Sequence, residues 1–331
     1  MPDTKPIVLV TEPEYLKGAA SFQNAASLNC VRAPDAEEDL ASAIRTSEAH
    51  YVIVGNRKYS GPLYNAMPAG GVIARLGVGH DGIDKTQATA AGVLCTNTPG
   101  VLDQSVAEHA MLLIAAAARQ LIPALAAMNT AAWTSPAGRD LFGKRLAIIG
   151  CGGIGRALAR IATVGYGMRA VGCTRPGVPP PATLEHFASV TNEFSEAVRD
   201  ADFVSLHMPA RPENAAFLNR GRLEQMRESS WLVNTARGAV VDEAALFDAL
   251  ASKRIAGAAL DVFAREPYVP ATGSGDLRSL PNVILTPHVG SNTVESNTRM
   301  AERALMNINF ARNGEVGRMD VVNPDVLTIE R

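Results

Sequence analysis

The feature that most constrains the fold is a glycine-rich segment at residues 144–161, Lys-Arg-Leu-Ala-Ile-Ile-Gly-Cys-Gly-Gly-Ile-Gly-Arg-Ala-Leu-Ala-Arg-Ile. Gly150, Gly152 and Gly155 have the spacing G-x-G-x-x-G, directly after a run typical of a buried strand and directly before a run typical of a helix. In that context Gly150 permits a tight turn, Gly152 lets the backbone approach a phosphate, and Gly155 allows close packing of helix on strand. The segment therefore predicts the strand, turn and helix that begin a βαβ unit.

Short β-branched runs alternate with helical patterns along almost the whole chain. The predicted strands are residues 7–10, 51–54, 72–76, 146–149, 170–173, 203–206, 231–233 and 283–285. Apolar and polar residues do not strictly alternate within these runs, as expected for strands that helices cover on both faces. We therefore predict an α/β protein built from doubly wound parallel sheets.

Two interruptions of this pattern predict how the chain divides into domains. At 331 residues the chain is longer than one hydrophobic core usually accommodates. The sequences Asn-Thr-Pro-Gly at 97–100 and Thr-Pro-His-Val-Gly at 286–290 look like crossings between domains. We predict a discontinuous domain of residues 1–99 and 290–331, with residues 100–289 inserted as a second domain.

Composition excludes several classes of protein. The chain has 31 Lys and Arg against 33 Asp and Glu and no dense basic run, so nucleic acid is not an expected partner. Its cysteines, Cys30, Cys95, Cys151 and Cys173, form no C-x-x-C pair, which argues against a structural metal site and fits a reducing cytoplasm. The longest apolar stretch, residues 110–118, is far shorter than the roughly 20 residues of a membrane span. We predict a cytoplasmic protein with no metal.

The glycine segment also predicts a dinucleotide site, because the N-terminus of the following helix offers free N–H groups to a pyrophosphate. In such sites an acidic residue normally ends the second strand and accepts hydrogen bonds from the adenine ribose. Thr174 and Arg175 stand at that position here. A hydroxyl and a guanidinium can bind a 2′-phosphate, so NADP(H) is the predicted cofactor. NAD(H) is the alternative if Arg175 is only a solvated surface residue.

Three further segments each place a reactive side chain at or just after the end of a predicted strand, where α/β sheets bind ligands. They contain Arg237 in Asn-Thr-Ala-Arg-Gly, Glu266 in Phe-Ala-Arg-Glu-Pro, and His288 in Thr-Pro-His-Val-Gly. Taken singly, the three residues also fit ordinary roles, as a surface ion-pair partner, a loop carboxylate and a structural histidine.

Together, and in this order behind the glycine segment, these residues resemble the D-isomer-specific 2-hydroxyacid dehydrogenase family. The resemblance covers about residues 72–309 and includes Arg-Leu-Gly-Val-Gly-His-Asp-Gly-Ile-Asp at 75–84, Ser-Val-Ala-Glu-His at 105–109, Leu-His-Met-Pro at 206–209 and the segment 232–243. It implies a Rossmann-type cofactor domain inserted into a smaller, flavodoxin-like substrate domain.

The resemblance implies an oxidoreductase that transfers a hydride from NAD(P)H to a small 2-oxo acid and gives the D-2-hydroxy acid, or the reverse. Arg237 is expected to hold the substrate carboxylate with its planar donor fork, which a lysine cannot reproduce. His288 is expected to donate the proton to the developing alkoxide. Glu266 is expected to orient the imidazole ring and to favour its protonated form.

Further contacts follow from the same resemblance. The backbone N–H groups of Gly77, Val78 and Gly79 are expected to bind the substrate carboxylate. With Arg237 and His288, they make up the predicted substrate-binding residues. Asp261 is expected to contact the nicotinamide carboxamide. Many relatives carry Arg or another long side chain where this chain has Gly153, which predicts either the loss of one phosphate contact or its transfer to Arg156 or Arg175. In all, the residues predicted to line the cofactor are Val78, Val106, Gly150, Gly152, Gly153, Ile154, Gly155, Thr174, Arg175, His207, Met208, Pro209, Thr235, Arg237, Asp261, His288 and Gly290.

The substrate and the assembly are less constrained. The compact chain resembles the glyoxylate and hydroxypyruvate reductases more than the longer phosphoglycerate dehydrogenases, but no residue identifies the group on C2 of the substrate. Two other hypotheses stay open, a dinucleotide-sensing corepressor that resembles C-terminal binding protein, and a formate or phosphite dehydrogenase on the same fold. The apolar helix predicted at residues 105–119 and the following arm with Trp133 predict a homodimer, although burial within one chain explains the same helix.

Overall fold

The structure, a computed structural model, describes residues 5–175, 177, 185–271, 273 and 275–328. The chain divides into two compact units, Met1–Leu102 with Asn292–Arg331, and Asp103–Ser291. The second unit is therefore an insertion in the first. Its limits differ by a few residues from the domain boundaries that the sequence pattern predicts.

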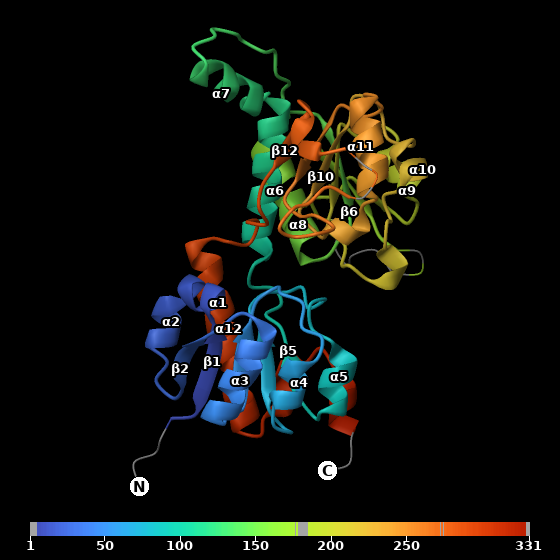
Figure 1. The fold of residues 1–331 in the computed structure, drawn as a ribbon. Coiled ribbons are helices and arrows are strands. Elements are labelled where there is room, and N and C mark those ends of the chain that lie inside the picture. The colour runs from blue at the N-terminus through green and yellow to red at the C-terminus, as the bar shows by residue number, and fades with distance from the viewer. Residues whose placement is uncertain (1–4, 176, 178–184, 272, 274, 329–331) are drawn as a thin grey trace. The chain divides into compact units, whose positions relative to one another are not determined.

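The first unit contains a parallel sheet of five strands in the order β2-β1-β3-β4-β5. The strands are β1 Ile7–Thr11, β2 Asn29–Ala33, β3 Tyr51–Val54, β4 Val72–Arg75 and β5 Leu94–Thr96. The helices around it are α1 Glu12–Lys17, α2 Ala19–Gln23, α3 Glu37–Ser47, α4 Pro62–Ala66, α5 Lys85–Ala90 and the C-terminal α12 Val294–Arg312 (Figure 1). This strand order is that of flavodoxin-like folds, which confirms the predicted class of this unit.

The second unit contains a parallel sheet of seven strands in the order β12-β11-β10-β9-β6-β7-β8. The strands are β6 Arg145–Ile149, β7 Arg169–Cys173, β8 Ser189–Thr191, β9 Phe203–Leu206, β10 Trp231–Asn234, β11 Gly257–Leu260 and β12 Val283–Leu285. The helices are α6 Asp103–Ala118, α7 Leu121–Asn129, α8 Gly153–Arg160, α9 Phe194–Val198, α10 Arg220–Leu223 and α11 Glu243–Ala251. The chain begins this sheet at an inner strand, β6, adds β7 and β8 on one side, and then returns to add β9 to β12 on the other, as in a Rossmann fold, which confirms the prediction.

The apolar helix α6 is buried within this unit, since ten of its 16 residues are buried. The next helix, α7, has no buried residue and extends from the end of α6 (Figure 1). In the part of the chain that the structure describes, no single helix is long and apolar enough to cross a membrane. Among the described helices, α6 and α7 reach that length and composition when taken together, but the two are bent by 66° relative to each other.

Candidate active site

The carboxyl ends of β10, β11 and β12 lie side by side at one edge of the seven-stranded sheet. The parallel register pairs Asn234 with Leu260 and Leu260 with Leu285, so the three strands end in one row. The loops that follow carry Arg237, Glu266 and His288, respectively. The three side chains predicted to be catalytic therefore belong to neighbouring loops at the edge where α/β sheets bind ligands.

His288 and Glu266 are in direct contact. Nδ1 of His288 lies 2.6 Å from Oε2 of Glu266. The other carboxylate oxygen of Glu266 accepts a hydrogen bond of 3.1 Å from the backbone N–H of Phe263, which fixes the carboxylate on both sides. Since Nδ1 is engaged, Nε2 is the ring nitrogen that His288 can present to a substrate.

The backbone at His288 adopts an unusual conformation, with φ of 55°. A residue with a side chain pays about 1–3 kcal/mol for this left-handed region, so surrounding contacts have to hold it there. His288 N–H donates to the backbone oxygens of Asp261 (2.8 Å) and Thr286 (3.1 Å). The next two N–H groups, of Val289 and Gly290, donate to the Asp261 carboxylate at 2.9 and 2.8 Å. Asp261 therefore sets the direction in which the imidazole points.

The Asp261 carboxylate is almost completely buried, with 1% of the residue exposed. It accepts a 2.6 Å hydrogen bond from Thr286 Oγ1 and lies 3.4 Å from Nε2 of His109 on α6. Burial alone raises the pKa of Asp261, but hydrogen bonds from His109, Thr286 and the two backbone N–H groups lower it below its ordinary value. His109 and Thr286, which the sequence analysis did not single out, are thus positioning residues for the His288 loop. The contact between Asp261 and a carboxamide stays a prediction.

The Arg237 loop is held by Asn234 at the end of β10. The Asn234 side chain accepts from the N–H of Ala236 (3.0 Å) and donates to the carbonyl of Arg237 (2.9 Å). A Cβ atom on Gly238 would lie 1.8 Å from the carbonyl carbon of Phe263, so only glycine allows the two loops to touch. The loop of Arg237 therefore packs directly on the loop that leads to Glu266.

A second carboxylate, Glu243, lies under the Glu266 loop. It is buried, and it accepts a 2.6 Å hydrogen bond from the backbone N–H of Ala264. Burial raises the pKa of Glu243, and the negative charge of Glu266 raises it further. The sequence pattern does not mark Glu243, because its segment is typical of the start of an ordinary helix.

The glycine segment forms the turn between β6 and α8. Gly150 has φ of +108°, and a Cβ atom there would lie 2.5 Å from the carbonyl oxygen of His207. A Cβ atom on Gly155 would lie 2.2 Å from the carbonyl oxygen of Gly150, which requires glycine where α8 packs on the turn. Nothing lies within 4 Å of the Cβ position of Gly152, so the backbone at the start of α8 is accessible.

The surrounding residues fit a dinucleotide. In the described part of the chain, Nδ1 of His207 and Oγ1 of Thr235 are buried and have no hydrogen-bond partner. His207 follows β9, which adjoins β6 in the sheet, and Thr235 follows β10, the next strand beyond β9. Unpaired buried polar atoms are rare in proteins, and a polar ligand here would pair them. No group of three or more His, Cys, Asp or Glu side chains among the described residues could hold a metal ion.

Asp103 explains why residue 153 is a glycine. A Cβ atom on Gly153 would lie 1.9 Å from Oδ2 of Asp103, the first residue of α6. Burial raises the pKa of Asp103, while the positive charge of Arg156 on α8 partly opposes that shift. The carboxylate thus takes the space that a side chain at residue 153 would need, a pairing that only the fold reveals.

Thr174 and Arg175 follow the end of β7, next to the glycine turn. Thr174 Oγ1 donates a 2.6 Å hydrogen bond to Oδ1 of Asn192. The Arg175 side chain is 54% exposed and lies 3.9 Å from Glu213. The position of the missing acidic residue is therefore occupied by a hydroxyl and a cation.

Gly77, Val78 and Gly79 belong to the first unit, directly beyond β4. Gly77 has φ of +143°, and its carbonyl accepts a 3.0 Å hydrogen bond from Thr98 N–H. The carbonyl of Val78 accepts a 2.7 Å hydrogen bond from the Asn97 side chain. The N–H of Gly77 donates to the carbonyl of Arg75 at 3.0 Å, so it is engaged within the chain. The role predicted for the N–H groups of this turn stays a prediction.

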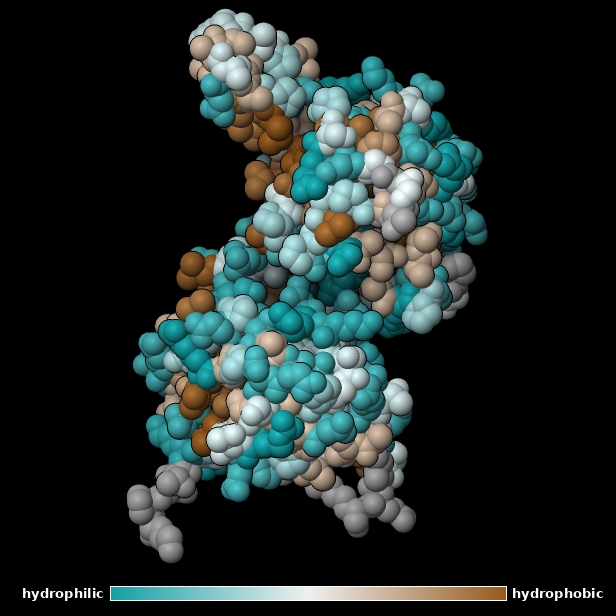
Figure 2. Space-filling view, in the orientation of Figure 1, coloured by the Kyte–Doolittle hydropathy of each residue, from teal (hydrophilic) through white to brown (hydrophobic). Residues whose placement is uncertain are grey.

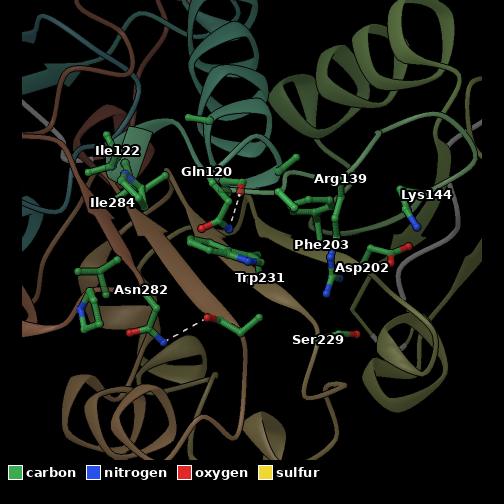
Figure 3. A pocket seen from close by; sticks show the side chains of 18 of the residues that line it. Gln120, Ile122, Arg139, Lys144, Asp202, Phe203, Ser229, Trp231, Asn282 and Ile284 are labelled. Atoms are coloured by element: carbon green, nitrogen blue, oxygen red, sulfur yellow. Dashed lines mark hydrogen bonds between the residues drawn. The ribbon is translucent and has the colours of Figure 1, made fainter. Parts of the chain in front are cut away.

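A pocket of about 390 Å³ lies at the opposite, amino edge of the seven-stranded sheet (Figure 3). Lys144, Asp202 and Trp231, which line it, stand just before or at the start of β6, β9 and β10. Gln120 and Ile122, at the junction of α6 and α7, line it from above. None of the residues predicted to be catalytic lines this pocket, so it is separate from the candidate active site.

His207 gives the first testable prediction. Burial lowers its pKa to about 4 from an ordinary value of 6.5, so the folded protein holds the ring neutral. Below pH 6.5 the His207 ring is protonated in the unfolded chain but stays neutral in the folded chain down to about pH 4. The free energy of unfolding therefore falls over this pH range. The loss is up to about 3 kcal/mol. We expect urea unfolding between pH 7.5 and 4.5 to show this loss of unfolding free energy in the parent protein. In His207→Asn the part of the pH dependence that comes from His207 should be absent. An equal pH dependence in both proteins would contradict the expectation.

Comparison with known proteins gives the same assignment as the site. Residues 111–290 match the family model described as D-isomer specific 2-hydroxyacid dehydrogenase, NAD binding domain. The chain is 37% identical over 298 residues to glyoxylate reductase of Thermococcus litoralis, covering 87% of each chain. The NADPH-dependent glyoxylate/hydroxypyruvate reductase from Sinorhizobium meliloti, solved with NADP and malonate, is 30% identical over 93% of each chain, with a TM-score of 0.78.

A second solved structure, D-lactate dehydrogenase from Aquifex aeolicus with NAD and lactic acid, is 26% identical over 96% of this chain and 99% of that chain, with a TM-score of 0.80. These similarities extend over both units of the chain. The chain belongs to the D-isomer specific 2-hydroxyacid dehydrogenase family and is an NAD(P)-dependent oxidoreductase.

Proposed function

We propose that the enzyme reduces a small 2-oxo acid of the glyoxylate or hydroxypyruvate kind, with NADPH as the preferred donor. The observation that carries the proposal is the contact between His288 and Glu266, 2.6 Å, beside the Arg237 loop at the ligand-binding edge of the sheet. The similarity to glyoxylate reductases over most of the chain supports the choice of a small substrate.

Each residue then has a separate task. The nicotinamide supplies a hydride to C2 of the substrate when it is bound. Arg237 holds the substrate carboxylate through paired N–H donors and so orients the carbonyl. His288 Nε2 gives a proton to the carbonyl oxygen as negative charge develops there, and Glu266 stabilises the protonated ring through Nδ1. In the oxidative direction His288 takes the same proton back.

The test is a set of initial rates with NADPH and NADH over glyoxylate, hydroxypyruvate, pyruvate and bulkier 2-oxo acids. We expect the highest kcat/KM for glyoxylate or hydroxypyruvate. Oxidation of formate or phosphite, measured in the same way, separates the related dehydrogenases. Tight NADPH binding without turnover of any of these substrates would contradict the proposal and favour the dinucleotide-sensing hypothesis.

The cofactor preference gives the second prediction. Neither Thr174 nor Arg175 offers a carboxylate that could accept hydrogen bonds from both ribose hydroxyls of NADH, whereas Arg175 can pair with a 2′-phosphate. Such a charge-assisted contact is worth about 1.5–3 kcal/mol, or roughly 10- to 150-fold in affinity. We expect Thr174→Asp combined with Arg175→Ala to raise KM for NADPH, lower KM for NADH, and so reverse the preference.

Salt offers a control for that substitution. Because Arg175 is about half exposed, its contact with a phosphate is screened, and the NADPH preference should shrink at high ionic strength. Equal efficiency with both cofactors in the parent protein, or a preference for NADH, would show that Arg175 points into solvent.

We also propose that the enzyme acts as a homodimer. Leu121, Ile122, Leu125 and Met128 on α7 are exposed, and Trp133 beyond it is 89% exposed. Figure 2 shows hydrophobic residues gathered where α7 joins α6. A patch of this kind normally marks an interface, and a second copy of the arm would cover it. Sedimentation should give a dimer, and a monomer at micromolar concentration would contradict this. The predicted cytoplasmic location stays a prediction.

A further inference from the structure

Two arginines from different loops share one carboxylate at the carboxyl edge of the seven-stranded sheet. Nη1 of Arg175, after β7, lies 3.9 Å from Oε1 of Glu213. Nη1 of Arg211, after β9, lies 3.8 Å from the same oxygen. All three side chains are about half exposed. Two cations therefore converge on a single negative oxygen within reach of solvent.

The topology places this cluster beside the dinucleotide turn. In the sheet, β7 and β9 lie on either side of β6, and the turn that begins at Gly150 follows β6. The loop that carries Arg211 also touches this turn, because His207 closely approaches Gly150. The adenine ribose of a dinucleotide binds at the end of the second strand of such a unit, here β7. Both guanidinium groups thus belong to loops that border the predicted position of the ribose.

The Arg211 loop is ordered by its own hydrogen bonds. Asn214, which is buried, donates from its side chain to the carbonyl of Pro209 at 2.8 Å. Arg211 N–H donates to the same carbonyl at 3.1 Å, and Asn214 N–H donates to the carbonyl of Arg211 at 2.9 Å. A loop that is tied in this way holds the arginine backbone in one place and lowers the entropy lost when the side chain binds.

We propose that Arg211 and Arg175 together bind the 2′-phosphate of NADP(H), and that Glu213 is the counter-ion which this phosphate replaces. The inference rests on the proposed use of NADPH and extends it to residues that the glycine motif does not mark. A phosphate monoester carries about −1.5 to −2 charges and three acceptor oxygens, so it can pair with both guanidinium groups. One exposed carboxylate offers them less charge and fewer acceptors.

The test compares the Kd values of 2′,5′-ADP and 5′-AMP by calorimetry, because these ligands differ by the 2′-phosphate and neither carries a nicotinamide. We expect Arg211→Ala to weaken binding of 2′,5′-ADP about tenfold and to leave 5′-AMP unchanged. Glu213→Gln should strengthen the binding of 2′,5′-ADP several-fold, since the 2′-phosphate no longer has to displace a carboxylate from the two arginines. Arg220→Ala is the matched control, because it removes an exposed arginine of the same unit that pairs with Asp248.

The outcomes separate this inference from the proposed function. A ratio of the two Kd values that is the same in Arg211→Ala as in the parent protein would overturn it, as would equal binding of both ligands by the parent protein. If Arg211→Ala loses the preference for 2′,5′-ADP over 5′-AMP and the enzyme turns over none of the 2-oxo acids, the proposed phosphate site would be supported and the proposed reductase activity would be overturned. Weakened binding of 2′,5′-ADP in Arg220→Ala to the same degree would show a general charge effect and overturn the specific role of Arg211.

Discussion

Replacing His288 with alanine is expected to lower kcat for reduction by about 10²–10⁴-fold, the usual contribution of general acid catalysis, with little change in the Kd for NADPH. The reason is that the ring, whose Nδ1 is held by Glu266 at 2.6 Å, presents Nε2 to the substrate oxygen. Stopped-flow measurement of NADPH oxidation and fluorescence titration of NADPH measure the two quantities separately.

His186 provides a matched control for this substitution. It is also a partly exposed histidine with a positive φ, 67°, and its Nε2 lies 3.4 Å from the carboxylate of Glu185. It does not belong to any of the three loops that carry the predicted catalytic residues, so His186→Ala should keep near-normal turnover. A near-normal rate in His288→Ala would remove His288 from the mechanism, whatever the control shows.

Replacing Arg237 with lysine is expected to reduce kcat/KM by roughly 10- to 150-fold, although the charge is retained, because an ammonium group cannot reproduce a planar two-donor contact with a carboxylate. Asn234 fixes the backbone at Arg237, so the loss should come from the side chain and not from a displaced loop. Steady-state kinetics with the best 2-oxo acid measures the effect.

Arg278→Lys is the control for the arginine substitution. Arg278 also makes a two-pronged contact with a carboxylate, from Nε to Oδ1 of Asp276 at 2.9 Å and from Nη2 to Oδ2 at 2.7 Å, but on the exposed surface. We expect that variant to keep the parent kcat/KM. If Arg237→Lys matched the parent protein in both kcat and KM, Arg237 would lie outside the site.

Most of the strands that the sequence pattern predicts are β-branched and apolar runs inside the two sheets, and the edge strand β12 is predicted as well. The pattern misses β5, a buried edge strand of only three residues. The pattern does not predict β2, Asn29–Ala33, or β8, Ser189–Thr191, which are edge strands whose residues are largely exposed or half-buried. It also does not predict β11, Gly-Ala-Ala-Leu, which is fully buried but lacks β-branched residues. Neighbouring strands, and not local propensity, make these segments extended.

For the candidate active site, too, the sequence predicts local motifs but not the contacts that the fold creates between distant segments. The loops of Arg237, Glu266 and His288 could be predicted because each motif is local in the sequence. The residues that position them could not, because His109 comes from α6 and meets Asp261 only through the fold. The same holds for Asp103 against Gly153 and for Arg175 against Glu213. In each case one local segment carries only half of the interaction.

The most direct test of the central claim is the configuration of the product formed from hydroxypyruvate. The account predicts one glycerate for each NADPH oxidised, all of it the D-isomer by chiral chromatography, with formation strongly reduced in His288→Ala. Formation of L-glycerate, or oxidation of NADPH without formation of glycerate, would contradict the assignment of Arg237, Glu266 and His288 to the reduction of a 2-oxo acid.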